Sequence, residues 1–367
     1  MQDPNDPDSV IIRTRKKERK RSHSKKKRMH PALKVILIIL AVLLAIAISV
    51  GIALAVAINQ GNVNLHQMLN GNETTIAESN VETQDDGQIV EYKGHTYKYN
   101  ENIASVVLIG HDDESSMGFG DRSLADTIVL FTIDTSTNKV RATVVPRNSW
   151  VPVDLYNEDG TYAGTREMQI TLSHGVTLPT IYDCAGNTVK AVSRVFYNMP
   201  MVYFFDFGGD AVANATSAVG GVQVEALETI PGANYVAGDT VLLEGDAAFH
   251  YVQYREVDAD ESALDRQKRQ VQFMQAFLAK ARTLGVQELI SLYNGVSDEI
   301  ATNLGASEIA YLISCFVTGD NAELEIVALE GKTVVGREAD GIEYERYMLD
   351  QDNVLENTLA AYYTQID

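Results

Sequence analysis

The chain has 367 residues, enough for one large domain or two small ones, and a formal net charge of −20. Residues 1–34 hold 12 of the 30 lysines and arginines but only 4 of the 50 acidic residues. The remaining 18 basic and 46 acidic residues form an acidic body, which argues against nucleic-acid binding there. Two cysteines, Cys184 and Cys315, are too few for a disulfide framework; they either pair or stay buried as thiols, and we expect thiols.

An uncharged apolar segment at residues 35–58 follows the basic run and is predicted to be a transmembrane helix. It is long enough to cross a hydrocarbon layer of about 30 Å at about 1.5 Å per residue. The basic flank predicts that residues 1–34 form a cytoplasmic tail and that everything beyond Asn59 is extracellular. The alternative is a cleaved signal peptide, but its apolar core is usually only about 7–15 residues. We therefore expect a single-pass protein of the cell membrane.

Residues 59–88 are polar and are expected to form an extracellular stalk, followed by one extracellular domain at 89–367. A hairpin is predicted at 89–99, with its turn at Lys93-Gly94. Further strands are expected at 105–110, 127–133, 140–145, 201–207, 222–224 and 323–329, with a loop at 152–169. Helices are expected at 188–197, 211–219, 262–284, 286–293, 306–315 and 353–363. This alternation predicts an α/β fold with a mixed central β-sheet flanked by helices.

The helix predicted to begin at Ser262 and to stop before Gly285 carries the most informative pattern. Positions 266, 269, 270, 273 and 277 fall on one stripe, because a helix repeats every ~3.6 residues. Two arginines near the N-terminal end of a helix are repelled by the positive end of its dipole. Together with that dipole, however, they would attract a bound anion. Phe273 and Phe277 behind them indicate a ligand with a charged head and an apolar remainder. The alternative is a solvated basic helix end that pairs with nearby acidic residues.

Several familiar catalytic patterns are missing. No two of the seven histidines are spaced as a pair on one predicted helix, which disfavours a zinc hydrolase. No G-x-S-x-G elbow is present. Gly331-Lys332-Thr333 ends like a phosphate-binding loop, but Ile326 stands where that loop requires glycine.

Arginines and acids recur instead at the ends of predicted strands and helices. Several guanidinium groups can bind a pyrophosphate, because each offers two parallel hydrogen bonds. Asp112 and Asp126 could act as carboxylate ligands of a divalent cation. For any single arginine, neutralisation of the acidic surface is the simpler alternative. The residues concerned are Arg122, Asp126, Arg147, Arg255, Arg266 and Arg269.

Taken together, these segments resemble the LytR-CpsA-Psr family from about Ile89 to Asp367. These are membrane-anchored bacterial proteins that join lipid-carried glycopolymers to the cell wall. The order and spacing of the segments, behind a basic flank and an apolar anchor, carry the resemblance. They are residues 108–112 (LIGHD), 122–128 (RSLADTI), 145–147 (VPR), 220–222 (GGV), 243–248 (LEGDAA), Arg255, 266–270 (RQKRQ) and 301–304 (ATNL).

The resemblance implies an apolar groove for a polyprenyl tail and an arginine-lined mouth that binds pyrophosphate together with Mg²⁺. It also implies a phosphotransferase that moves a teichoic acid, capsule or other wall polysaccharide from undecaprenyl pyrophosphate to peptidoglycan. Asp126, Arg147 and Arg266 would then be catalytic, and Asp126 and Asp112 would serve the metal or the incoming hydroxyl. The implied pyrophosphate ligands are Arg122, Arg147, Arg255, Arg266, Arg269 and Gln270.

Three positions depart from the pattern of that family. Asn148 replaces the usual aspartate after Pro-Arg, Gln253 replaces the first arginine of R-x-R, and Gln169 replaces a frequent lysine. An amide can coordinate a metal through its oxygen but cannot act as a base. One alternative is therefore a non-catalytic relative that binds polyprenyl pyrophosphate. Another is a regulatory protein of the transcription-attenuator kind, which would use the basic N-terminus.

Overall fold

The computed structural model describes residues 51–65, 76, 81–111, 123–233, 235–256, 262–319, 325–337 and 343–367. Residues 53–367 belong to one compact unit. The predicted cytoplasmic tail and most of the predicted transmembrane segment at 35–58 lie outside the described residues. Within the described stretches, no helix is both long enough and apolar enough to span a membrane.

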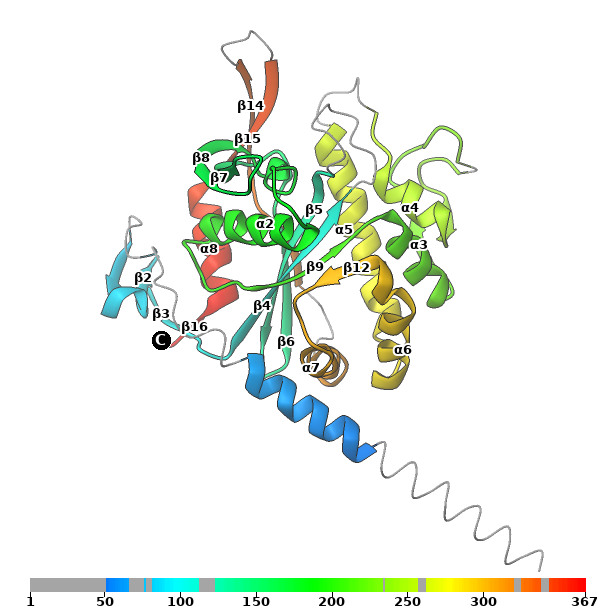
Figure 1. Ribbon diagram of the computed structural model, residues 1–367, viewed down its shortest axis with the longest axis horizontal. Coiled ribbons are helices and arrows are strands. Elements are labelled where there is room, and N and C mark those ends of the chain that lie inside the picture. The colour runs from blue at the N-terminus through cyan, green and yellow to red at the C-terminus, as the bar shows by residue number, and fades with distance from the viewer. Residues whose placement is uncertain are drawn as a thin grey trace, which may run out of the picture. The chain divides into compact units, whose positions relative to one another are not determined.

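A six-stranded mixed sheet lies at the centre of the fold (Figure 1). Its strands are β4 (Ile103–His111), β5 (Ala125–Asp134), β6 (Lys139–Val144), β9 (Tyr203–Phe207), β12 (Ile300–Thr302) and β13 (Glu325–Ala328). The spatial order is β12-β9-β4-β5-β6-β13. The β4–β9 and β6–β13 pairs are parallel, and the other three pairs are antiparallel. The predicted mixed central sheet is confirmed.

Helices cover both faces of this sheet (Figure 1). On one face, Val107 and Ile109 of β4 belong to the main core together with residues of α2 and α8. On the other face, Val106 packs with residues of α7, and Leu108 packs with residues of α5. Alternate residues of β4 thus face opposite helical layers, as the two-residue repeat of a strand requires. The helices are α2 (Ile181–Val195), α3 (Gly209–Ala218), α4 (Asp246–Gln253), α5 (Ser262–Ala281), α6 (Val286–Val296), α7 (Ala306–Thr318) and α8 (Gln351–Tyr362).

A second sheet, with four antiparallel strands, includes the predicted hairpin at 89–99. Its strands are β1 (Glu82–Gln84), β2 (Ile89–Tyr92), β3 (His95–Tyr99) and β16 (Tyr363–Gln365). Lys93 and Gly94 have φ angles of 52° and 83°. Positive φ at both central residues is typical of the tight turn whose twist matches a hairpin. The predicted turn is confirmed.

The loop predicted at 152–169 is wrong. The chain forms a hairpin there, from β7 (Trp150–Tyr156) and β8 (Tyr162–Gln169). Pro152 lies inside β7, and a two-stranded ribbon tolerates proline because each strand has a free edge. Two further hairpins pair β10 (Val222–Glu225) with β11 (Thr240–Leu243), and β14 (Gly331–Arg337) with β15 (Glu343–Leu349). Neither complete hairpin was predicted.

The range 59–88, expected to be a stalk, contains folded structure that packs on the domain. The chain is helical over 51–65, and Leu65 is completely buried in a cluster with residues of α7. The side-chain amide of Asn64 donates a hydrogen bond to Glu308 Oε1 at 2.7 Å. Ile76 is also buried, in the main core. Isolated apolar residues in a polar segment thus attach it to the domain, which begins before Ile89.

Both cysteines are buried thiols that form no disulfide, as expected. Cys184 lies in α2, which packs on one face of the sheet, and Cys315 lies in α7, which packs on the other. Burial also raises the pKa of the Cys315 thiol. Both side chains therefore act as small apolar residues.

Candidate functional site

An apolar cavity of about 290 Å³ lies between the central sheet and α5. The sheet contributes its β4–β5–β6 face, and α5 contributes Phe273, Met274, Phe277 and Leu278. The rings of Phe273 and Phe277 stack with centroids 6.1 Å apart. A largely apolar lining binds hydrocarbon without leaving unpaired polar groups. The remaining lining residues include Leu108, Val129, Phe131, Val144, Ala211, Val212, Val296 and Ile300.

A smaller polar cavity of about 40 Å³ adjoins the apolar one. The two are continuous in their walls, because Thr127, Phe207, Val212, Val252 and Gln270 line both. The polar cavity adds side chains that carry charge or hydrogen-bonding groups: His111, Asp126, Gln253 and Arg266. The combined shape suits a ligand with a polar head and an apolar tail.

Helix α5 joins the two cavities. Arg266 lines the polar cavity, Gln270 lines both, and Phe273 and Phe277 line the apolar one. This order along the helix follows the predicted stripe. Lys268 lies off the stripe, and its ammonium pairs with Asp265 on the exposed side at 2.8 Å. The alternative of a solvated basic helix end therefore describes Lys268 but not Arg266, whose side chain is only 5% exposed.

Asp126 of β5 bridges two arginines at the polar cavity. Its Oδ1 lies 2.7 Å from Nη1 of Arg147, and its Oδ2 lies 2.9 Å from Nη1 of Arg266. The three side chains are nearly buried, with exposed fractions of 12% or less. One carboxylate between two guanidinium groups leaves a net charge of +1. Nη2 of Arg266 is buried and has no hydrogen-bond partner among the described residues. An anion bound in the cavity would satisfy both the charge and this donor.

Arg269 and Arg255 make contacts of a different kind. Arg269 is 1% exposed, and its guanidinium donates to the carbonyl groups of Tyr251, at 2.9 Å, and Tyr254. It also forms an ion pair with Glu228. Burial lowers the pKa of Arg269 to about 10. Arg269 thereby ties α5 to the end of α4.

The other predicted ligands are placed as follows. Nε of Arg255 donates to Oγ of Ser262 at 2.9 Å, at the first residue of α5. The side-chain amide of Gln270 faces the carbonyl of Val252 at 3.3 Å. Arg122 and Asp112 lie outside the described residues. The structure thus brings Asp126, Arg266 and Gln270 to the cavities, and Arg147 contacts Asp126 without lining either cavity. Arg255 and Arg269 instead make contacts at the start of α5 and at the end of α4.

The three amides that depart from the family pattern occupy two places. Asn148 and Gln169 both contact Glu345 of β15, through the carboxylate at 3.3 Å and the backbone carbonyl at 2.6 Å. They therefore attach the β14–β15 hairpin to the domain. Gln253 instead lines the polar cavity and is exposed.

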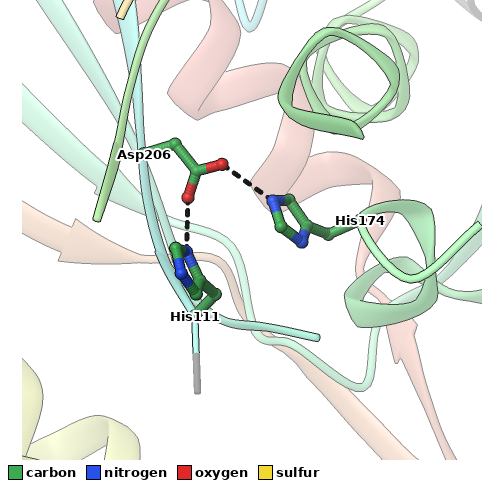
Figure 2. Close-up of side chains that lie close together, drawn as sticks. All are labelled: His111, His174 and Asp206. Carbon is green, nitrogen blue, oxygen red and sulfur yellow. Dashed lines mark hydrogen bonds and ion pairs between the residues drawn. The ribbon is translucent and has the colours of Figure 1, made fainter. Parts of the chain in front are cut away.

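A cluster of His111, Asp206 and His174 borders the polar cavity and was not predicted (Figure 2). Oδ1 of Asp206 lies 2.7 Å from Nδ1 of His111, and Oδ2 lies 2.7 Å from Nε2 of His174. Burial by itself lowers the pKa of His174, but Asp206 and the Ser123 carbonyl outweigh it, so this pKa lies above its usual value. Burial likewise opposes the effect of the two imidazoles on Asp206, whose pKa nevertheless lies below its usual value.

Spacing along the chain could not reveal this cluster. The three residues come from the end of β4, from the loop after β8 and from β9. The one available signal was Asp206 itself, a lone carboxylate inside the apolar run 201–207 that was predicted as a buried strand. A carboxylate in such a strand requires a partner.

The carboxylate of Asp126 fits one part of a magnesium site. Mg²⁺ in enzymes is commonly held by one or two carboxylates together with phosphate oxygens and water. Both oxygens of Asp126 contact an arginine, Oδ1 with Arg147 and Oδ2 with Arg266. The second expected ligand, Asp112, lies outside the described residues.

Comparisons with known proteins agree with this architecture. A model of the LytR_cpsA_psr family matches residues 62–361. The polyisoprenyl-teichoic acid–peptidoglycan teichoic acid transferase TagU of Bacillus subtilis (strain 168) is 22% identical over 208 residues. That match covers 54% of this chain, and the chain spans 60% of the length of TagU.

Two solved structures share the fold. TagV of B. subtilis superposes with a TM-score of 0.54 and 18% identity, covering 71% of this chain and 95% of TagV. A structure of TagT bound to LIIa-WTA gives a TM-score of 0.51 and 20% identity, covering 71% of this chain and 90% of TagT. Since the family model covers most of the chain, this protein belongs to the LytR_cpsA_psr family.

Proposed function

We propose that this protein is a phosphotransferase that attaches a glycopolymer, carried on a polyprenyl pyrophosphate, to peptidoglycan. One observation carries the proposal: an apolar cavity adjoins a polar cavity lined by Asp126 and Arg266, and Asp126 also pairs with Arg147. The related TagU enzymes are named for teichoic acid transfer to peptidoglycan, which supports the same reaction class here.

In the proposed reaction, a peptidoglycan hydroxyl attacks the phosphorus that carries the glycopolymer. A new phosphodiester forms, and polyprenyl phosphate leaves. The first units of the polyprenyl chain would lie against Phe273 and Phe277, which places the pyrophosphate beside Arg266. Catalysis of this kind depends on positioning and on neutralising the charge that builds up on phosphate oxygens.

Three side chains would position the pyrophosphate. Arg147 and Arg266 would donate to its oxygens, and Asp126 would hold both guanidinium groups in place. Mg²⁺, held by Asp126 and by phosphate oxygens, would supply further charge neutralisation. Gln270, at the junction of the two cavities, would contact the phosphate nearer the lipid.

A single-turnover assay tests this proposal. Purified protein would be combined with a synthetic polyprenyl-pyrophosphoryl sugar, Mg²⁺ and peptidoglycan fragments, and the phosphodiester product would be measured. We expect transfer by the natural protein, a loss of at least about 100-fold in Arg266→Ala, and full activity in Lys268→Ala. Lys268 is the matched control, because it is a cation on the exposed side of the same helix. Equal activity of both variants would refute the role of Arg266.

A second candidate function is lipid-pyrophosphate binding without transfer. It is favoured by three neutral amides at positions where the family pattern has a charged residue. Asn148 and Gln169 contact β15, and Gln253 lines the polar cavity. The two functions differ in one experiment. If the double variant Asn148→Asp, Gln253→Arg transfers the polymer and the natural protein only binds the lipid, the binding function is correct.

We further propose that residues 35–58 anchor the protein in the cell membrane with residues 1–34 in the cytoplasm and the main domain outside. The charge asymmetry of the N-terminal sequence supports this, as does a lipid-borne substrate. Protease treatment of intact cells should digest the main domain and spare an epitope placed at residue 1. Protection of the main domain would contradict this orientation.

A further inference from the structure

We propose that His111, Asp206 and His174 form a binding site for a divalent transition-metal cation at the edge of the polar cavity. The donors come from three separate parts of the chain and converge in the interior (Figure 2). The side chains of Asp206 and His174 are 0% and 3% exposed, and that of His111 is 10% exposed. Their ligand atoms all lie within 4.8 Å of one another.

The backbone builds this convergence. β4 and β9 are parallel neighbours, with Ile109 opposite Asp206 and Gly110 opposite Phe207. His111 follows directly at the end of β4, so its ring reaches back to the carboxylate on the next strand. His174 approaches from the loop that follows β8. Its ring lies nearly parallel to that of His111, at 14° with centroids 5.4 Å apart. Both rings thus present a nitrogen to the same carboxylate.

A second observation supports a metal: the orientation of His174 is fixed from behind. Its Nδ1 lies 2.9 Å from the carbonyl oxygen of Ser123, and a carbonyl can only accept, so Nδ1 is the donor. This leaves Nε2 directed at the cluster. Histidine ligands in metalloproteins almost always donate their other N–H to a carbonyl or carboxylate in this way, which sets the tautomer and the ring plane.

Binding of an ion requires the three side chains to move. In a tetrahedral zinc site with ligand distances of about 2.0–2.2 Å, two ligand atoms lie about 3.3–3.6 Å apart. The donor atoms, all within 4.8 Å of one another, would move relative to one another by up to about 1.5 Å to reach that spacing. An ion would take the place of the two short contacts that Asp206 makes with the imidazoles.

The donor set selects the kind of cation. Two imidazole nitrogens and one carboxylate suit Zn²⁺, Mn²⁺, Fe²⁺, Co²⁺ or Ni²⁺, whereas Mg²⁺ prefers oxygen ligands alone. Three protein ligands also leave at least one coordination position for another group. His111 lines the same cavity as Asp126 and Arg266. A cation held by His111 would therefore border the region where an anionic ligand would bind.

Metal binding by the full chain tests this inference without any transfer assay. Untagged protein would be stripped with a chelator and titrated with Co²⁺, whose visible absorption reports coordination by protein nitrogen. Zn²⁺ would then be measured by titration calorimetry and by metal analysis after dialysis. We expect one tightly bound ion per chain at this site, little competition from millimolar Mg²⁺, and a rise in melting temperature with added Zn²⁺.

Variants assign the ion to these residues. His174→Gln and His111→Asn should each weaken metal binding by at least about 100-fold, since even the loss of an outer-shell partner costs about 10–100-fold. His250→Gln is the matched control, because His250 is exposed on α4. His111→Asn is included because His111 is the least buried of the three, so this variant should fold even where the other one does not. Absence of stoichiometric metal in the natural protein, or unchanged binding in both folded variants, would overturn the proposal and leave a metal-free hydrogen-bonded cluster.

Discussion

Asp126 is the residue whose loss should affect the site most, because it neutralises two nearly buried arginines. Asp126→Asn would remove the negative charge that both Arg147 and Arg266 contact. Removing one partner of a buried ion pair costs about 3–5 kcal/mol, and we expect a loss of this size in the free energy of unfolding measured with urea.

Two comparisons test the cause of that loss. Asp265→Asn, which changes an exposed carboxylate of α5, should cost less than about 1 kcal/mol. Adding Arg266→Met to Asp126→Asn should recover part of the stability, because it removes one of the two guanidinium charges that Asp126 contacts. A double variant less stable than Asp126→Asn alone would show that charge is not the reason.

Asp134 makes stability depend on acid pH. Partial burial by itself would raise the pKa of Asp134, but hydrogen bonds from Ser136, Thr137 and Asn100 outweigh it and hold the pKa below its usual value. The stabilisation is therefore complete above the unfolded pKa of about 3.9 and is lost as pH falls through the lower folded value.

The corresponding measurement compares Asp134→Ala with the natural protein from pH 7 to pH 2. The variant should be less stable by about 1–2 kcal/mol at pH 7, because backbone donors of the β5–β6 turn lose their acceptor. The difference should shrink below about pH 4. A difference that stays constant to pH 2 would contradict the role of the charged form.

At the scale of an element, the proposed ligand would contact two parts of α5, its lipid at Phe273 and Phe277 and its pyrophosphate at Arg266. Phe273→Ala should weaken binding of a polyprenyl pyrophosphate by about 10–100-fold, since burying a phenylalanine side chain is worth about 1.5–3 kcal/mol. Binding of inorganic pyrophosphate should not change. Arg266→Ala should weaken both, because it removes a contact to the shared anionic group. Calorimetry with the two ligands gives the comparison, and equal losses for both ligands in Phe273→Ala would show that the two cavities do not act separately.

Helix α5 could be predicted because its signals are local. A polar residue at 262 and a 3.6-residue repeat define the start of the helix and the face that lines the cavities. The predicted stop was less accurate, because α5 ends at Ala281 and Gly285 is the N-cap residue of α6. The β7–β8 hairpin could not be predicted in this way. Its strand β8 is mostly exposed, so it lacks an alternation of apolar and polar residues, and Pro152 argues against a strand.

At the scale of the whole molecule, the site depends on contacts that sequence spacing does not contain. Asp126 and Arg266 are 140 positions apart, and Asp206 lies 95 positions from His111 and 32 from His174. The first pair could be predicted only through the resemblance to a family. The histidine cluster has no such signal, because it forms only when β4 and β9 pair and the loop after β8 packs over them.

At the same scale, the helix at 51–65 offers a test of whether it packs on α7. Gly61 of this helix lies against α7, where a Cβ would overlap the backbone carbonyl of Ser307 and lie 2.9 Å from Cβ of Tyr311. Gly61→Ala should therefore push the helix away from α7, expose Leu65 and lower the free energy of unfolding by about 1–3 kcal/mol. The matched control is Gly295→Ala in α6, where a Cβ meets no atom within 4 Å. This change should raise stability by about 0.5–1 kcal/mol, because alanine loses less backbone entropy than glycine. Opposite signs of the change in the free energy of unfolding would show that Gly61 and Leu65 belong to the folded domain, whereas a gain in both variants would mean that this part of the helix does not pack on α7.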